Sequence, residues 1–233
     1  MTQRRFASVH ETLVARLGDG QYLGAQPGIS ATRPTWSQTL IRHPHLHGRV
    51  TGGGVTERGQ GVAVRNGLLW PMRVGMAVCR GKRLAAMRQG VVPGTLPLPA
   101  GQRRPQVENR LNQLGRVQWQ VHIRERYPDG QGVLVYLARY WRGGPIAHRR
   151  RLACDGQQVV LGYEARAKGP GGQATRGTMR LPLAQCIGRW RLHVPPPGAV
   201  RVRCWGLYAP THAEVLAPCR RQLGQGPVAV PAP

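Results

Sequence analysis

The stretch His43-Pro44-His45-Leu46-His47 organises the interpretation of this 233-residue sequence. Alternate residues of an extended strand point to the same side, so we expect His45 and His47 to project together while Leu46 faces a core. Neutral imidazoles are common metal ligands, and two of them side by side form half of a metal site. The alternative is an ordinary pair of surface or hydrogen-bonded histidines. We predict a histidine strand over residues 38–51 with His45 and His47 as metal ligands.

A second stretch, Tyr136-Leu137-Ala138-Arg139-Tyr140, carries two tyrosines four residues apart. On a helix this spacing places both side chains on one face, with their Cβ atoms about 5–6 Å apart. Such a pair is either core packing or a pair of nucleophiles. Its presence beside a histidine pair in a very basic chain favours nucleophiles.

The charge balance points to a polyanionic partner. The sequence has 34 Lys plus Arg against 9 Asp plus Glu, a formal net charge of +25. A genome of high GC content explains part of the arginine, glycine and proline excess, but it does not explain the scarcity of acidic residues. Each phosphate that is neutralised releases counterions and adds affinity, so nucleic acid is the predicted partner.

Other compositional features exclude several classes. Five cysteines are scattered without a Cys-x-x-Cys pair, which argues against a disulfide framework and a cysteine zinc site. No apolar run approaches the roughly twenty residues needed to cross a bilayer, and the N-terminus lacks a signal-peptide pattern. We expect a chain that does not enter the membrane and that works in the cytoplasm, associated with the nucleoid.

Helical and strand patterns follow one another without regular alternation. Alternating polarity predicts a strand at residues 117–123, and Asp155-Gly156 predicts a type I′ hairpin turn between residues 152–154 and 159–161. Gly52-Gly53-Gly54 closes the histidine strand either as a flexible turn or as a place where a DNA backbone approaches closely. Helices are predicted at residues 9–17, 71–89, 107–114, 183–192 and 213–223, and further strands at 178–181 and 200–204. This mixture predicts an α+β fold with an antiparallel sheet.

Three groups of residues, in order along nearly the whole chain, resemble the rolling-circle insertion-sequence transposases with a two-tyrosine HUH nuclease. The first comprises Trp36-Ser37-Gln38-Thr39-Leu40, the histidine stretch and the three glycines. The second comprises Val133 to Tyr140 with Gly143-Gly144-Pro145-Ile146, and the third Leu192-His193-Val194-Pro195 with Tyr208-Ala209-Pro210. Members of that family usually carry a cysteine-rich, zinc-binding module before the nuclease segment. Because this sequence starts only about forty residues before the histidines, we expect an N-terminally truncated form without that module.

The resemblance implies a fold and a division of the chain. We expect an HUH-nuclease-like antiparallel sheet flanked by helices, with the catalytic tyrosines on a helix that follows the histidine strand. The expected parts are a nuclease core at residues 1–145, a C-terminal α+β extension at 146–224 and a disordered tail at 225–233.

The resemblance also implies a reaction. Tyr136 and Tyr140 are the expected nucleophiles in metal-dependent nicking and rejoining of single-stranded DNA at transposon ends and target, through a 5′-phosphotyrosine intermediate. His45 and His47 are expected to hold Mg²⁺ or Mn²⁺. His43 is the preferred third ligand.

Several points stay open in the sequence. His122 and Glu125 are alternatives for the third metal ligand, and either tyrosine is able to attack first. Candidate DNA-phosphate contacts are Arg49, Arg139 and Arg142, of which Arg49 and Arg139 are equally well interpreted as ordinary solvated arginines. The rival function is a catalytically inactive DNA-binding remnant of a truncated transposase. An RNA-binding basic protein is less favoured because the sequence lacks a paired aromatic motif for RNA recognition.

Overall fold

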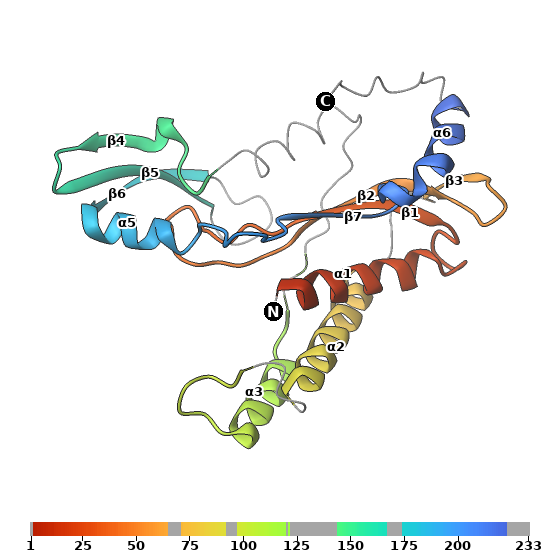
Figure 1. The fold of residues 1–233 in the computed structure, drawn as a ribbon, viewed down its shortest axis with the longest axis horizontal. Helices are drawn as coiled ribbons and strands as arrows, with labels where there is room; N and C mark the ends of the chain where they lie inside the picture. Colours follow the sequence, from red (N-terminus) through yellow and green to blue (C-terminus); the bar gives the residue numbers. More distant parts are fainter. Residues whose placement is uncertain are drawn as a thin grey trace. The chain divides into compact units, whose positions relative to one another are not determined.

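The computed structural model describes residues 2–64, 71–91, 97–119, 121, 144–166 and 174–222 (Figure 1). The fold is α+β with antiparallel strands and flanking helices, which confirms the predicted class. In chain order the elements are α1 (Thr2–Leu17), β1 (Gln26–Thr32), β2 (His47–Val55), β3 (Gly61–Ala63), α2 (Met72–Val91), α3 (Arg104–Arg116), η2 (His148–Arg150), β4 (Arg151–Cys154), β5 (Gln158–Arg166), β6 (Ala174–Pro182), α5 (Leu183–Arg191), β7 (Val202–Gly206), η3 (Pro210–His212) and α6 (Ala213–Gln222).

Contacts group the chain into two units. Unit 1 comprises Met1–Ser30, Arg49–Arg126 and Cys204–Pro233, and unit 2 comprises Ala31–Gly48 and Tyr127–Arg203. Each unit therefore combines stretches that are far apart in sequence. The division at residue 145 expected from the sequence stays a prediction.

Unit 1 is built on a sheet of strand order β3-β2-β1-β7. Leu13 and Leu17, which recur at helical spacing on α1, pack against Ala25 and Ile29 in one buried cluster. Helix α1 lies against α2, and α2 lies against α3 (Figure 1). Helix α1 ends at Leu17, as its pattern predicts, but it begins earlier than expected, at Thr2.

The three glycines lie inside β2, so the predicted turn at this point is wrong. Gly53 pairs with Ala63 of β3, and a Cβ on Gly53 would meet the Val62 carbonyl oxygen at 2.5 Å. A Cβ on Gly54 would meet the Gln26 carbonyl oxygen at 2.5 Å. Glycine is required at these two positions because the neighbouring strands come so close. The alternative, that a DNA backbone approaches this stretch, stays a prediction.

Unit 2 contains the antiparallel sheet β4-β5-β6. Val159 of β5 pairs with Leu181 of β6, and both side chains lie in one buried cluster with Cys186 of α5. Leu161, opposite Met179, extends this cluster along the strand. The hairpin predicted between residues 152–154 and 159–161 is confirmed, as is the helix after β6.

The hairpin turn differs from the type I′ prediction. The Asp155 amide donates to the Gln158 carbonyl oxygen at 3.2 Å, so the central residues are Gly156 and Gln157. Gly156 has a φ of 87°, whereas Gln157 has no positive φ. Glycine at the first central position with a single positive φ is the pattern of a type II′ turn. The Asp155 carboxylate accepts the amides of Gln157 and Gln158, and these bonds lower its pKa.

The strand predicted at residues 117–123 is absent from its described part, residues 117–119 and 121. Trp119 instead turns back onto the end of α3, where its Nε1 donates to the Leu114 carbonyl oxygen at 3.0 Å. The Val117 carbonyl oxygen accepts a 3.0 Å bond from the Arg80 guanidinium of α2. These helix contacts take the place of strand pairing.

Within the described residues, no helix is long and apolar enough to cross a bilayer.

Candidate functional site

Backbone pairing lays the histidine stretch against the residues that precede it. The His43 amide donates to the Thr35 carbonyl oxygen at 2.7 Å, and the His45 amide donates to that of Pro34 at 3.2 Å. We call residues 34–47 the histidine hairpin. Its backbone bonds fix where the histidine rings emerge.

The predicted strand over residues 38–51 is wrong in its first half. Trp36 and Arg42 form an antiparallel bridge, and the chain turns between them. Leu40 in this turn has a φ of 61°, the left-handed conformation that non-glycine residues rarely adopt. Strand β2 begins only at His47 and then continues through Val55 without a break at Arg49.

The three histidine rings follow one another closely. The ring centroids of His43 and His45 lie 5.0 Å apart, and those of His45 and His47 lie 4.7 Å apart with the rings at 73°. The expectation that the side chains of His45 and His47 lie together is confirmed. Their role as metal ligands stays a prediction.

The hydrogen bond of His45 defines its tautomer. Its Nδ1 lies 2.7 Å from the His43 carbonyl oxygen, and because a carbonyl oxygen only accepts, Nδ1 carries the proton. The Nε2 lone pair is therefore available to a ligand. Burial lowers the pKa of His45, the bond to the His43 carbonyl raises it, and the neighbouring His43 ring lowers it. In the neutral Nδ1–H tautomer of His45, Nε2 is the electron-pair donor.

The third metal ligand stays open. Among the residues that the structure describes, no three His, Cys, Asp or Glu side chains gather into a metal-binding group. The His43 ring is a neighbour of His45. The two alternatives, His122 and Glu125, lie outside the described residues.

The other predicted site residues divide into two groups. Arg49 lies half-buried in β2. The tyrosine stretch, with Tyr136, Arg139 and Tyr140, lies outside the described residues, as does Arg142.

Three residues near the hairpin escaped sequence reasoning. Arg150, Arg189 and His193 each donate to a backbone carbonyl oxygen of residues 38–40. His193 lies in the segment Leu192-His193-Val194-Pro195, which carries part of the family resemblance. That segment does not predict a contact with a turn 153 residues earlier.

The fold and the site together define a basic α+β protein that presents a histidine pair from a hairpin. A family model described as "Putative transposase" matches residues 28–215, so the chain belongs to this transposase family. It is 31% identical over 234 residues to "Putative transposase y4qJ" of Sinorhizobium fredii, covering 98% of this chain and 57% of that protein. It is 26% identical over 136 residues to "Transposase for insertion sequence element IS801" of Pseudomonas savastanoi pv. phaseolicola, covering 54% of this chain and 31% of that protein. No solved structure matches.

Proposed function

We propose that the chain carries the nuclease part of a transposase that nicks and rejoins single-stranded DNA through a 5′-phosphotyrosine intermediate, as in rolling-circle transposition. Family membership supports the general activity. The observation that carries the finer proposal is the His45–His47 pair, with ring centroids 4.7 Å apart and the His45 Nδ1 proton committed to a carbonyl oxygen. Work on DNA would place the protein with the nucleoid in the cytoplasm.

The histidine pair fits a divalent cation. An imidazole whose Nδ1–H is fixed by a carbonyl oxygen presents Nε2 in the form that metal ions bind. His45 and His47 would hold Mg²⁺ or Mn²⁺ together with a third ligand. Imidazole suits transition metals better than it suits Mg²⁺, so Mn²⁺ is the ion to test first. When bound, such an ion polarises a phosphoryl oxygen and stabilises the charge that develops on it.

The nucleophile in this proposal is the hydroxyl of Tyr136 or Tyr140. The hydroxyl gives up its proton and its oxygen forms a bond to phosphorus while the bond from phosphorus to the 3′ oxygen breaks. The 3′ oxygen takes up a proton and leaves as a hydroxyl, so one proton is lost and one is gained. Because the phosphotyrosyl bond conserves the energy of the phosphodiester, a later 3′-hydroxyl is able to rejoin the strand. Two tyrosines allow two such linkages in succession.

The proposed partner is single-stranded DNA at transposon ends and target. A net charge of +25 attracts such a polyanion. Arg49, Arg139 and Arg142 are the proposed contacts to its phosphates.

The rival proposal is a DNA-binding protein without turnover. The observation that favours it is the lack of a complete group of three metal ligands among the described residues. Both proposals predict DNA binding, so the formation of a covalent adduct separates them.

The test incubates the full chain with Mn²⁺ and single-stranded DNA from the ends of a related element, and then looks for a covalent adduct on a denaturing gel. We expect His45→Ala and His47→Ala to abolish nicking while salt-sensitive DNA binding stays nearly intact. His212→Ala, at a half-buried histidine in unit 1, is the matched control and should nick normally. Nicking that survives both hairpin substitutions refutes the metal role.

The tyrosines are tested with phenylalanine, which removes the hydroxyl and keeps most of the ring packing. The double variant Tyr136→Phe, Tyr140→Phe should fold and form no adduct. At least one single variant should still nick but be impaired in strand transfer. Mass spectrometry of a trimmed adduct should find the nucleotide on one of these two residues, and an adduct on Tyr163 or Tyr208 would contradict the assignment.

A further inference from the structure

Three consecutive carbonyl oxygens at the tip of the histidine hairpin each accept a bond from a distant side chain of unit 2. Arg150 Nη2 donates to the carbonyl oxygen of residue 38. Arg189 Nη1 donates to that of residue 39 at 3.2 Å, and His193 Nε2 lies 2.9 Å from that of residue 40. These donors lie 112, 150 and 153 residues further along the chain. We call Arg150, Arg189 and His193 the carbonyl clamp.

The turn at the hairpin tip needs such support. Leu40 combines a φ of 61° with a fully buried side chain in the cluster of Val159, Leu161 and Leu181. A left-handed leucine persists only where its surroundings impose it. The buried side chain on one side of the turn and the hydrogen-bonded carbonyl groups on the other together impose this conformation.

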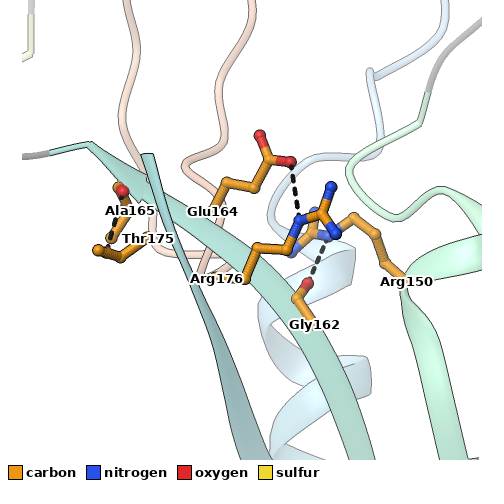
Figure 2. Close-up of polar contacts among 6 residues, drawn as sticks. All are labelled: Arg150, Gly162, Glu164, Ala165, Thr175 and Arg176. Carbon is orange, nitrogen blue, oxygen red and sulfur yellow. Dashed lines mark hydrogen bonds and ion pairs between the residues drawn. The ribbon is translucent and has the colours of Figure 1, made fainter. Parts of the chain in front are cut away.

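Arg150 uses its guanidinium for hydrogen bonds within the protein. Its Nε donates to the Gly162 carbonyl oxygen of β5 at 2.8 Å (Figure 2), and its Nη1 donates to that of Pro145 at 3.1 Å. Because its Nη2 also donates to the Gln38 carbonyl oxygen, this one guanidinium joins three backbone segments. Burial lowers its pKa, although an arginine stays charged throughout the working range.

His193 connects the clamp to the hairpin histidines. Its Nε2 donates to the Leu40 carbonyl oxygen, and its Nδ1 is hydrogen-bonded to the Thr35 hydroxyl, 3.2 Å away. The Thr35 carbonyl in turn accepts the His43 amide at 2.7 Å, and the His43 carbonyl accepts His45 Nδ1 at 2.7 Å. Only two residues therefore separate the 6%-exposed His193 from the ring of His45.

We propose that Arg150, Arg189 and His193 are positioning residues that hold the histidine hairpin in the conformation that brings His45 and His47 together. The metal consequence rests on the function proposed above. The hairpin geometry itself does not, so the two are tested separately.

The first experiment measures Mn²⁺ affinity of the full chain by electron paramagnetic resonance, without DNA. His193→Ala should weaken Mn²⁺ binding by about tenfold, the low end for a residue that orients a metal ligand. His193→Gln retains an N–H donor for the Leu40 carbonyl and should restore most of the affinity. Arg191→Ala, which removes an exposed charge at the end of the same helix as Arg189, should change nothing.

The second experiment measures amide hydrogen exchange and needs no metal. In His193→Ala the amides of Leu40, His43 and His45, which all bond within the hairpin, should exchange about tenfold faster than in the wild type. Amides between β5 and β6 should be unchanged. If His193→Ala does not fold, Arg189→Ala removes one clamp donor and should speed the same amides about fivefold.

The outcomes separate the two proposals. A wild-type chain that binds no Mn²⁺ refutes the metal role, while the exchange data still decide the positioning role. Hairpin amides that keep their wild-type rates in both His193→Ala and Arg189→Ala overturn the positioning proposal. A His193→Gln variant as impaired as His193→Ala in both readouts also overturns it, because the donor would then be irrelevant.

Discussion

At position 40, the glycine variant should be as stable as the alanine variant or more stable, which is the reverse of the usual order. Both variants lose the side chain of a fully buried leucine, a change that typically costs about 2–5 kcal/mol. Alanine still has a Cβ that opposes the φ of 61°, whereas glycine does not. The comparison therefore isolates the backbone strain that the hairpin stores at Leu40.

The expected size follows from two opposing terms. The left-handed conformation costs a residue with a Cβ about 1–2 kcal/mol, which Leu40→Gly relieves. Glycine loses about 0.5–1 kcal/mol more than alanine through its extra freedom in the unfolded chain. Leu40→Gly should thus equal Leu40→Ala or exceed it by up to about 1.5 kcal/mol.

Leu161 is the matched control, because it is buried in the same cluster and has no positive φ. At that position the glycine variant should be less stable than the alanine variant by about 0.5–1 kcal/mol. The assay is urea unfolding followed by circular dichroism and by fluorescence, with coincident curves as the check for a single transition. If glycine is the worse residue by the same margin at both positions, the strain argument is refuted.

Three further predictions follow from single features. Gly54→Ala should destabilise the protein by about 1–3 kcal/mol in thermal unfolding because its Cβ would meet the Gln26 carbonyl oxygen at 2.5 Å, whereas Gly52→Ala, with nothing within 4 Å, should be neutral. Burial against Trp205 lowers the pKa of His10 despite the opposing effect of Glu11, so the unfolded chain binds a proton at this histidine more readily than the folded chain does. The stability of the wild type relative to His10→Gln should therefore fall as the pH drops below about 6.5. A stability difference that does not change with pH would contradict this. Affinity for single-stranded DNA should fall steeply with salt, and a flat plot of log K against log salt would exclude phosphate contacts.

Local signals in the sequence predicted the local structure well. The helix Leu183–Arg191 and the hairpin on either side of Asp155 follow from apolar periodicity and turn chemistry, which involve neighbours in the chain. The closeness of His45 and His47 was also predictable, because alternation in an extended segment does not depend on whether that segment pairs as a strand.

What the sequence did not reveal depends on contacts between distant residues. The turn at Leu40 interrupts the predicted histidine strand, and its conformation is imposed by the apolar cluster and by His193, 153 residues away. The alternation around Trp119 is typical of a strand, yet the Val117 carbonyl oxygen accepts a bond from Arg80 of α2, 37 residues earlier. In both cases tertiary contacts override the local pattern.

The uses of arginine in the fold change what the net charge implies for DNA binding. The Nε, Nη1 and Nη2 atoms of Arg150 all donate to backbone carbonyl oxygens, and Arg80 and Arg189 each donate to one backbone carbonyl oxygen. Such groups keep their charge and still attract a polyanion over distance, but these N–H groups are already used within the protein. Arg176 differs, because its side chain is 90% exposed and its Nε lies 3.9 Å from a Glu164 carboxylate oxygen at the surface, so most of its guanidinium still faces solvent. The salt slope counts the phosphates that are neutralised, at about 0.7 per phosphate for a single strand, so it should fall well short of the value that a charge of +25 suggests.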